Sequence, residues 1–290
     1  MVSVIIPYYN NSKEIKRSLS SVFAQTYQDF EIILINDASP DWEEGLPLIN
    51  AFNDDRIKII SHTSNKNGSA ARNTGINAAI GEYVAFLDAD DEWLANHLKN
   101  LLVVQKENNA ELVYSSCTVH SSNNFIYSLP KHSIAQSKNL GEYLFCENGF
   151  VATPSLLIKK SVAQKAFFNE KLIRHQDYDF LLRLEDNGVV FFWSKEPSVI
   201  VHWENNNLDA KGGTWKYSEI WIKENKKYLT PKARTCFILK FVVMRLLQRR
   251  DVKTGIFKFF KYCRLWHISP KKYYFLISTI LFGRIILLKK

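Results

Sequence analysis

The chain has 290 residues and a formal net charge of +9, with 46% hydrophobic and 23% charged residues. This length allows one large domain, or one domain with an appendage, and the composition excludes a disordered chain. The cysteines at 117, 146, 236 and 263 form no CxxC pair and have no His partner at metal-ligand spacing. We therefore expect four reduced thiols in a cytosolic protein.

Strand and helix patterns alternate over the first ~115 residues. The opening apolar run, residues 2–6, has no basic segment before it and no cleavage site after it, so it predicts a core strand rather than a signal peptide. Strands are expected at 2–6, 31–36, 56–61 and 83–87, and helices at 14–24, 42–52 and 69–80. The strands start every 25–29 residues. This spacing is typical of βαβ units and predicts an α/β fold with a mostly parallel sheet.

The pattern becomes less regular after residue 93. It predicts helices at 93–107 and 177–184, strands at 111–115 and 150–159, and extended segments at 189–193 and 198–203. Residues 123–148 show no clear period, and we expect a surface excursion there. After Pro231 the residues become apolar, basic and helix-favouring. We expect a domain over 1–228, in two halves that meet at 115/116, followed by a helical extension over 229–290.

Charge is distributed unevenly between these two parts. Residues 231–290 hold 15 Lys or Arg and a single acid, Asp251, which is +14; the other 23 basic and 28 acidic residues give −5. A strongly basic tail on an acidic body favours an anionic surface, either lipid head groups or nucleic acid.

Two apolar stretches interrupt the basic tail, at 235–247 and 273–288. The second contains Gly283 and Arg284 and is shorter than the ~20 residues that a spanning helix needs. Aromatic residues interleaved with Lys and Arg are typical of a pair of helices lying in a membrane interface. The alternative is a pair of helices packed on the main domain, with the basic residues simply solvated.

An acidic cluster, Asp88-Ala89-Asp90-Asp91, directly follows the strand expected at 83–87. Ligands of parallel sheets bind beyond the carboxyl ends of the strands. Three acids in four positions repel one another unless a cation lies among them, and carboxylates suit Mn²⁺ or Mg²⁺ held together with diphosphate oxygens. The alternative is a solvated acidic turn that caps the following helix.

Four segments in order, 4–10, 36–41, 67–76 and the acidic cluster, resemble the family 2 glycosyltransferases. They read VIIPYYN, NDASPD, NGSAARNTGI and DADD. The resemblance covers roughly residues 1–210 and implies the GT-A fold, a mostly parallel sheet flanked by helices, and inversion at the anomeric carbon of the donor sugar.

The resemblance also implies which residues bind the nucleotide-sugar. These are Pro7, Tyr9, Asp37, Gly68, Arg72, Asp88 and Ala89, with Asp90 on the metal, Mn²⁺ or Mg²⁺. Asp37 is suited to accept a hydrogen bond from uracil or ribose, although it could instead close a turn after its strand. Arg72 could face the diphosphate or form an ordinary surface ion pair.

A second element, Arg174-His175-Gln176-Asp177-Tyr178-Asp179, resembles the Glu-Asp motif that carries the family's general base. Gln176 replaces the usual Glu, but Asp177 keeps the carboxylate that takes the proton of the acceptor hydroxyl. Asp179 is the rival, and two residues along a helix it should face elsewhere. His202 is expected to complete the metal shell, although a single His is more often structural.

These features together predict a metal-dependent enzyme that moves a hexose from a UDP-sugar to a lipid-linked saccharide. The expected products are cell-surface polysaccharides such as O-antigen, lipopolysaccharide core or capsule, made at the cytoplasmic face of the membrane by a peripheral protein. Nucleic acid is not an expected partner, because the body of the chain is acidic. The alternatives are a nucleotidyltransferase and a non-catalytic nucleotide-sugar-binding protein.

Overall fold

The computed structural model describes residues 1–122, 125–134, 139–203 and 214–263. The chain forms two compact units: residues 1–136 with 150–206, and residues 137–149 with 207–290. This division differs from the expected boundary at 228/229, since a short internal segment and the residues just before 228 belong to the second unit. We call them the sheet unit and the helical unit.

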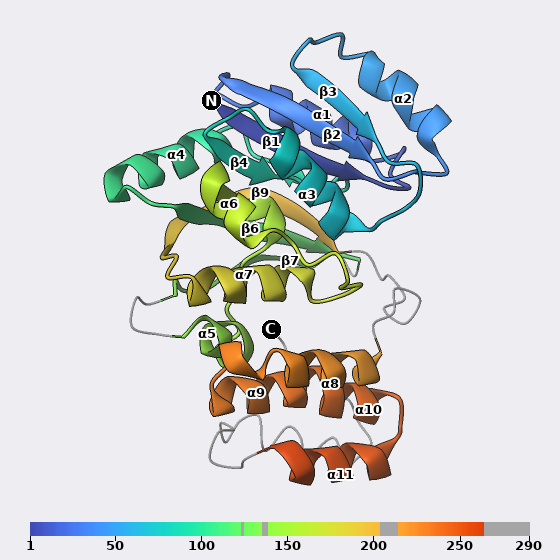
Figure 1. The fold of residues 1–290 in the computed structure, drawn as a ribbon, viewed down its shortest axis with the longest axis vertical. Helices are drawn as coiled ribbons and strands as arrows, with labels where there is room; N and C mark the ends of the chain where they lie inside the picture. Colours follow the sequence, from blue (N-terminus) through green and yellow to red (C-terminus); the bar gives the residue numbers. More distant parts are fainter. Residues whose placement is uncertain (123–124, 135–138, 204–213, 264–290) are drawn as a thin grey trace. The chain divides into compact units, whose positions relative to one another are not determined.

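The first half of the sheet unit consists of parallel strands joined by helices (Figure 1). Its elements are β1 (Val2–Tyr8), α1 (Ile15–Phe23), β2 (Phe30–Asn36), α2 (Trp42–Asn50), β3 (Ile57–Ser61), α3 (Gly68–Ala78) and β4 (Tyr83–Phe86). The strands lie in the order β3-β2-β1-β4 and are all parallel. The predicted βαβ organisation is therefore confirmed.

The strands in the second half of the sheet do not all run in the same direction as β4. β8 (Leu156–Lys159) is antiparallel to both β4 and β6 (Leu112–Ser121), and β9 (Phe191–Trp203) is parallel to β6. β5 (Glu92–Trp93) and β7 (Ile126–Leu129) are antiparallel additions to β9 and β6. As a result, β1, β2, β4, β6 and β9 share one direction, and their carboxyl ends lie at the same edge.

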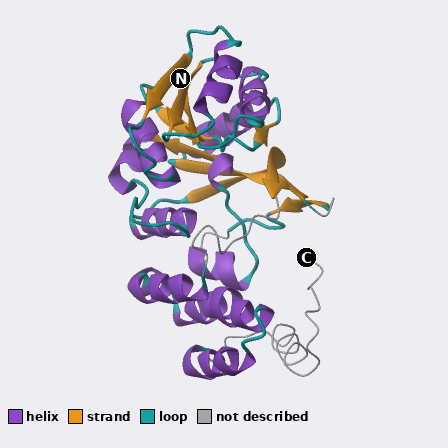
Figure 2. Cartoon of the chain, turned by 90° about the vertical axis from the view of Figure 1, so that its right-hand side faces the viewer, coloured by secondary structure: helices purple, strands orange, loops and turns teal. Residues whose placement is uncertain are grey.

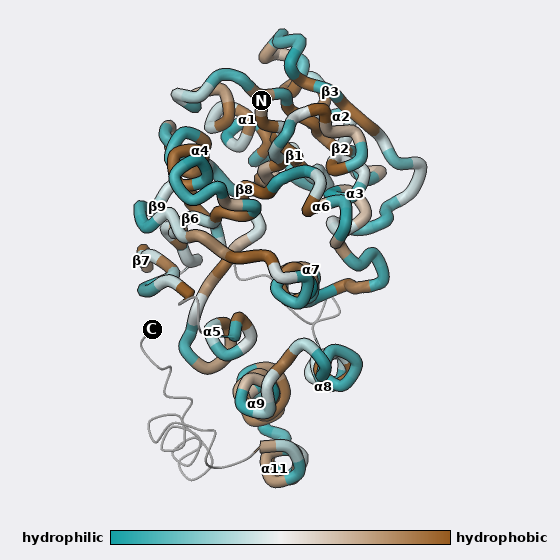
Figure 3. Tube along the Cα trace, turned by 60° about the vertical axis from the view of Figure 1, so that its left-hand side comes forward, coloured by the Kyte–Doolittle hydropathy of each residue, from teal (hydrophilic) through white to brown (hydrophobic). Residues whose placement is uncertain are grey.

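Helices flank both faces of this sheet (Figure 2). The remaining ones are α4 (His97–Asn108), η1 (Thr153–Ser155), α6 (Lys160–Ala166) and α7 (Gln176–Asp186). α3 packs very closely on β1, because a Cβ at Gly75 would collide with the side chain of Ile5. The buried hydrophobic residues of β1, β6 and β8 contribute to the core between the layers (Figure 3).

Four sequence expectations in the second half were wrong in detail. Of the strand expected at 150–159 only β8 forms, preceded by η1, and residues 123–148, expected as a surface excursion, contain β7 and the largely buried helix α5 (Leu140–Cys146). The helix expected from residue 93 begins at His97, because Glu92 and Trp93 pair with β9 instead. The two extended segments at 189–193 and 198–203 are one strand, β9. Its pairing with β6 shifts register at Pro197, which has no backbone N–H to contribute to the ladder.

His97 is fully buried where α4 packs on the sheet. Its Nδ1 lies 2.8 Å from Ser198 Oγ on β9, and its ring stacks on Trp93 at 4.5 Å between centroids. Burial lowers the pKa of His97 to about 3. The imidazole is therefore neutral in the folded protein, whereas in the unfolded chain it takes up a proton below about pH 6.5.

This difference makes stability depend on pH. Because the unfolded state binds more protons below pH 6.5, the free energy of unfolding should fall as the pH drops from 7 to 5, by about 2 kcal/mol from His97 alone. His97→Asn keeps a side chain that can hydrogen-bond to Ser198 but cannot be protonated. The free energies of unfolding from denaturant titrations at pH 7 and pH 5 should therefore differ less in this variant than in the wild type. An unchanged difference would show that His97 is not the source.

The helical unit has its own aromatic core. Its elements are α5 (Leu140–Cys146), α8 (Trp215–Glu224), η2 (Lys226–Tyr228), α9 (Pro231–Ile238), the π-helical η3 (Leu239–Val243), α10 (Met244–Gln248) and α11 (Val252–Tyr262). The ring of Phe237 lies 5.0 Å from Phe145 of α5 and 5.0 Å from Trp221 of α8. Through these contacts, α5 and α8 pack against α9 in the same unit.

The segment 235–247, expected in a membrane interface, lies instead largely in this core, with residues such as Phe237, Val242 and Leu246 buried. Among the described residues, no helix has the length and apolar character needed to cross a membrane. The other apolar stretch, 273–288, lies outside the described residues. All four cysteines are free thiols, as expected.

Candidate active site

The sheet unit places the expected site residues at the carboxyl edge of its parallel strands or on helices that begin there. Pro7 and Tyr9 lie at the end of β1, Asp37 directly after β2, Gly68 and Arg72 in the first turns of α3, Asp88, Ala89 and Asp90 after β4, Asp177 in the first turn of α7, and His202 near the end of β9. The common direction of these strands brings together positions far apart in the sequence.

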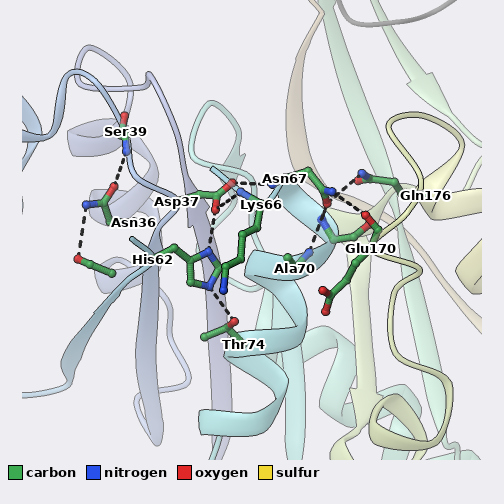
Figure 4. A network of polar contacts seen from close by, with 12 residues as sticks. Asn36, Asp37, Ser39, His62, Lys66, Asn67, Ala70, Thr74, Glu170 and Gln176 are labelled. Atoms are coloured by element: carbon green, nitrogen blue, oxygen red, sulfur yellow. Dashed lines mark hydrogen bonds and ion pairs between the residues drawn. The ribbon is translucent and has the colours of Figure 1, made fainter. Parts of the chain in front are cut away.

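Asp37 is buried, and donors fixed by the fold hold its carboxylate (Figure 4). Oδ1 accepts from the backbone N–H of Lys66 at 2.9 Å and lies 2.7 Å from His62 Nδ1, and Oδ2 accepts from the N–H of Asn67 at 2.8 Å. A carboxylate has about four acceptor positions, so about one remains for a ligand. The turn after β2 is closed by Asn36, whose Oδ1 accepts from the N–H of Ser39, and not by Asp37.

Asn67 connects the Asp37 carboxylate to the start of α3. Its backbone has a positive φ of 81°, and its side-chain oxygen caps the helix by accepting from the N–H groups of Ser69 and Ala70. Its Nδ2 donates to the carbonyl of Glu170 at 2.8 Å. Asn67 therefore fixes the loop after β3, the N-terminus of α3 and the loop before α7 relative to one another.

Gln176, which stands where the sequence resemblance implies a Glu, contacts the same network. Its Nε2 donates to the carbonyl of Leu172 at 2.6 Å and lies 3.5 Å from Asn67 Oδ1. Both partners are acceptors, so the site suits an amide and not a carboxylate, which can only accept when ionised. The neighbouring residue is Asp177, so the contact holds the turn that carries the expected base.

We expect Gln176→Glu to weaken the fold and any activity that depends on Asp177, even though it restores the residue that the sequence resemblance implies. The new carboxylate would face two acceptor oxygens and add a charge beside Asp177, which should cost about 1–3 kcal/mol of stability and lower kcat about tenfold. Melting curves, together with steady-state rates of the sugar transfer that the sequence predicts, test this. A variant as stable and active as the wild type would show that the amide is not needed.

Arg72 is a buried cation among acidic side chains. Its Nη2 lies 2.6 Å from Asp88 Oδ1, and its guanidinium lies 5.4 Å from the centroid of the Phe168 ring. Burial alone would lower the pKa of Arg72, but the charges of Asp88, Asp177 and Asp90 outweigh it and raise the pKa above its ordinary value. Asp88 thus contacts the guanidinium directly, and the charges of Asp177 and Asp90 also act on it; we call these four residues the Arg72 cluster.

Asp177 and Asp179 occupy different environments in the first turn of α7. Burial raises the pKa of Asp177, and Asp88 adds to this, while Arg72 and the Thr153 hydroxyl oppose it. Asp179 is buried against Arg183, with 2.8 Å between Oδ2 and Nε, and Arg183 also donates to the carbonyl of Phe167 at 2.6 Å. Asp179 thus ties α7 to the end of α6, whereas Asp177 belongs to the Arg72 cluster.

The last two acids of the DADD cluster also differ. Asp91 is buried and accepts from the backbone N–H of His202 at 2.9 Å. Burial, together with the charges of Asp88 and Asp90, raises the pKa of Asp91 well above its ordinary value. Asp90 is partly exposed, and its carbonyl accepts from Arg17 Nη2 at 2.6 Å. Of these two carboxylates, only that of Asp90 is accessible to a ligand.

His202, the other expected metal ligand, contacts Glu92. Its Nε2 lies 2.7 Å from Glu92 Oε1, which is also 3.3 Å from Arg17 Nε. Binding a metal through Nε2 would require this contact to break. The described residues contain no group of three or more His, Cys, Asp or Glu side chains arranged to hold a metal. The donor set therefore fits a cation that takes one or two carboxylates here and its other ligands from phosphate and water.

Several residues of the site escaped the sequence analysis. His62 bridges Asp37 and Thr74, with 2.9 Å from its Nε2 to Thr74 Oγ1, and Arg17 of α1 reaches the acidic cluster. Asn67 had a local signal, since it precedes the Gly-Ser start of a helix. Arg17, Glu92 and His62 had no such signal in the sequence, because their partners lie far away along the chain or across the sheet.

Comparison with known proteins shows the family of this chain. Residues 3–167 match the model of "Glycosyl transferase family 2". The amylovoran biosynthesis glycosyltransferase AmsB of Erwinia amylovora is 31% identical over 87% of this chain and 86% of its own length. The UDP-Glc:alpha-D-GlcNAc-diphosphoundecaprenol beta-1,3-glucosyltransferase WfgD of Escherichia coli is 36% identical over 88% of this chain and 98% of its own length.

Solved structures show the same fold at low sequence identity. The S. aureus TarS 1-349 structure in complex with UDP-GlcNAc superimposes with a TM-score of 0.59 at 17% identity, covering 91% of this chain and 73% of that one. The mannosyltransferase PcManGT of Pyrobaculum calidifontis, in complex with GDP-Man and Mn²⁺, gives 0.60 at 15% identity, covering 92% and 76%. From the matched family and the shared GT-A-like fold, we conclude that the chain is a glycosyltransferase and belongs to glycosyltransferase family 2.

Proposed function

We propose that the chain transfers a hexose, with inversion, from a UDP-sugar to a hydroxyl of a lipid-linked saccharide in the synthesis of a bacterial cell-surface polysaccharide. The observation that carries the proposal is the cluster of Asp88, Asp90 and Asp177 around the buried Arg72. The relatives support the substrate classes, since WfgD is named for a UDP-Glc donor and a diphosphoundecaprenol-linked acceptor, and AmsB for amylovoran synthesis.

The nucleoside would bind at the ends of β1 and β2. Asp37 offers its remaining acceptor position to a uracil N–H or a ribose hydroxyl, and Tyr9 is exposed at the end of β1 next to Pro7. Asp88 and Ala89 would line the ribose side. A Cβ at Gly68 would lie 3.2 Å from Arg72 Nη1, so glycine leaves room beside the guanidinium at the start of α3 for the diphosphate.

A divalent cation, when bound, would neutralise the charge that develops on the departing diphosphate. Asp90 would hold it. His202 would position Asp91 and Glu92 through its present contacts and join the metal only if it released Glu92. Asp90 is assigned this role because it is partly exposed, whereas the neighbouring Asp91 is buried.

Asp177 would act as the general base. Its carboxylate takes the proton of the acceptor hydroxyl while that oxygen attacks the anomeric carbon, and the bond to the diphosphate breaks with its electron pair leaving on UDP. Burial raises the pKa of Asp177 and so makes its carboxylate a stronger base, while Arg72 and the Thr153 hydroxyl act in the opposite direction. Asp179 is already engaged by Arg183 and is less suited to the role.

Lipid-linked acceptors lie at a bilayer surface, so we further propose that the protein binds the cytoplasmic face of the membrane peripherally. The charge of +14 over residues 231–290 supports this, because each basic residue near an anionic surface contributes ~1 kcal/mol.

A donor and acceptor screen tests the proposed function. UDP-Glc, UDP-Gal and UDP-GlcNAc would each be incubated with a synthetic lipid-diphosphate monosaccharide, with Mn²⁺, Mg²⁺ or EDTA, and the product's anomeric configuration determined by NMR. We expect transfer from one UDP-sugar, inversion, and loss of activity in EDTA. No transfer from any of the three UDP-sugars, retention of configuration, or full activity in EDTA would each overturn the corresponding part.

A further inference from the structure

The helical unit presents an amphipathic surface that the sequence did not single out. It lies on α11 and comprises Lys253, Phe257, Phe260 and Lys261, which we call the α11 face. These residues are spaced at i, i+4, i+7 and i+8, so they share one side of the helix. Phe257 is 60% exposed and Phe260 is 73% exposed, the highest value among the large hydrophobic side chains of the helical unit that the structure describes.

Contacts on the opposite side of α11 fix the orientation of the helix about its own axis. This orientation leaves the α11 face exposed. Glu219 of α8 is buried and binds Lys258 Nζ at 2.6 Å and Tyr262 Oη at 2.7 Å. Its pKa is lowered to about 2, because these hydrogen bonds outweigh the effect of burial. Phe259 is also buried, and a Cβ at Gly255 would lie 3.0 Å from Leu247. The helix cannot turn Phe257 and Phe260 inward without breaking these contacts.

The charges around the α11 face are almost all positive. Lys253 and Lys261 lie on it, and the exposed Arg249 and Arg250 immediately precede the helix. The single acid of this region, Asp251, caps α11 by accepting from the N–H of Thr254, where a negative charge is favourable. The other lysine of the helix, Lys258, is held by Glu219.

We propose that the α11 face is the surface by which the protein docks on an anionic lipid bilayer, with Phe257 and Phe260 inserted among the head groups and the basic residues paired with lipid phosphates. Exposed aromatic side chains flanked by Lys and Arg on a helix are the features of interfacial binding. The inference rests on the proposed peripheral membrane function and deepens it. It assigns the contact to α11, whereas the sequence had indicated 235–247, which is largely core.

The test uses the full chain, because ending it at residue 229 would remove Phe237 from its contacts with Phe145 and Trp221. The wild type should sediment with vesicles of equal parts phosphatidylglycerol and phosphatidylcholine and much less with phosphatidylcholine alone. Phe257→Ser/Phe260→Ser should weaken binding on the order of tenfold or more and abolish the part that persists in ~1 M salt, where screening is strongest. Lys253→Glu/Lys261→Glu should remove the binding that depends on low salt.

Matched controls come from the sheet unit. Phe125→Ser replaces a phenylalanine that is 68% exposed, and Lys99→Glu/Lys106→Glu reverses two exposed lysines of α4. Both controls should bind vesicles like the wild type. The proposal is overturned if a control weakens binding as much as its α11 counterpart, if the α11 variants bind normally, or if uncharged vesicles bind equally well. It is also overturned if light scattering shows a dimer that the phenylalanine substitutions dissociate, because a second copy would then cover this face.

Transfer to a short, soluble acceptor, measured in parallel, separates this proposal from the proposed function. All α11 variants should keep that activity, since they lie outside the catalytic site, while transfer to a long-chain acceptor in vesicles falls with binding. If the wild type transfers no sugar to either acceptor but the vesicle results hold, the proposed function fails and the docking surface stands.

Discussion

Asp177→Asn is expected to lower the rate of sugar transfer by about 10²–10⁴-fold while UDP-sugar binding stays unchanged. The amide is nearly isosteric with the carboxylate but cannot take the proton of the acceptor hydroxyl. Asp177 lies in the Arg72 cluster, where its charge acts on Arg72 and Asp88. Single-turnover rates and isothermal titration with UDP would separate the chemical step from binding.

The control is Asp179→Asn. This substitution removes the partner of Arg183, which holds α7 against the end of α6, so it should lower the melting temperature. The rate per folded molecule should change little. If Asp179→Asn instead abolishes transfer with full stability and normal donor binding, the base is Asp179 and the assignment is off by two residues.

The pH dependence of kcat provides an independent check on Asp177. A base must be deprotonated, so activity should be lost as the pH falls through the pKa of this carboxyl. Because burial raises that pKa, the acid limb should lie above the value of about 3.9 for an ordinary Asp. The limb should disappear in the residual activity of Asp177→Asn.

Asp90→Ala is expected to reduce transfer by about 10³-fold, since charge stabilisation by a metal contributes several kcal/mol in the transition state. UDP binding should lose its enhancement by Mn²⁺ or Mg²⁺. The fold should be largely unaffected, because Asp90 is partly exposed and the backbone carbonyl that accepts from Arg17 is kept in the variant. Titration calorimetry with UDP in the presence and absence of metal, together with circular dichroism, measures these effects.

Asp91→Asn is the matched control one residue along the chain. Burial raises the pKa of Asp91 far enough to favour the neutral form, and Asn retains an oxygen for the N–H of His202. Most metal-dependent transfer should therefore survive. Loss of metal-stimulated UDP binding in Asp91→Asn but not in Asp90→Ala would reverse the roles of the two residues.

The sequence by itself determined the elements of the first half of the sheet and the order of its motifs. β1 to β4 and α1 to α3 lie where the local pattern placed them, because alternation, turn residues and caps are set by neighbours along the chain. The acidic cluster follows β4, and a common strand direction is enough to bring it to the same edge as the ends of β1 and β2. The nucleotide-sugar roles given to these residues stay predictions.

Only the tertiary structure shows the different surroundings of residues that look alike in the sequence. Asp90 and Asp91 are adjacent acids, yet one is accessible and the other is buried against His202. Asp177 and Asp179 share a helical turn, yet one faces Arg72 and the other Arg183. Burial and partners of this kind depend on residues tens of positions away, and no local period encodes them.

The same reason explains the helical unit. Segment 235–247 and α11 both combine apolar and basic residues, and the sequence offered no means of telling which would face solvent. The side chains of α5 and α8 cover Phe237 and its neighbours, while Glu219 binds Lys258 and turns Phe257 and Phe260 outward. The partner that each apolar face meets in three dimensions decided which became core and which became surface.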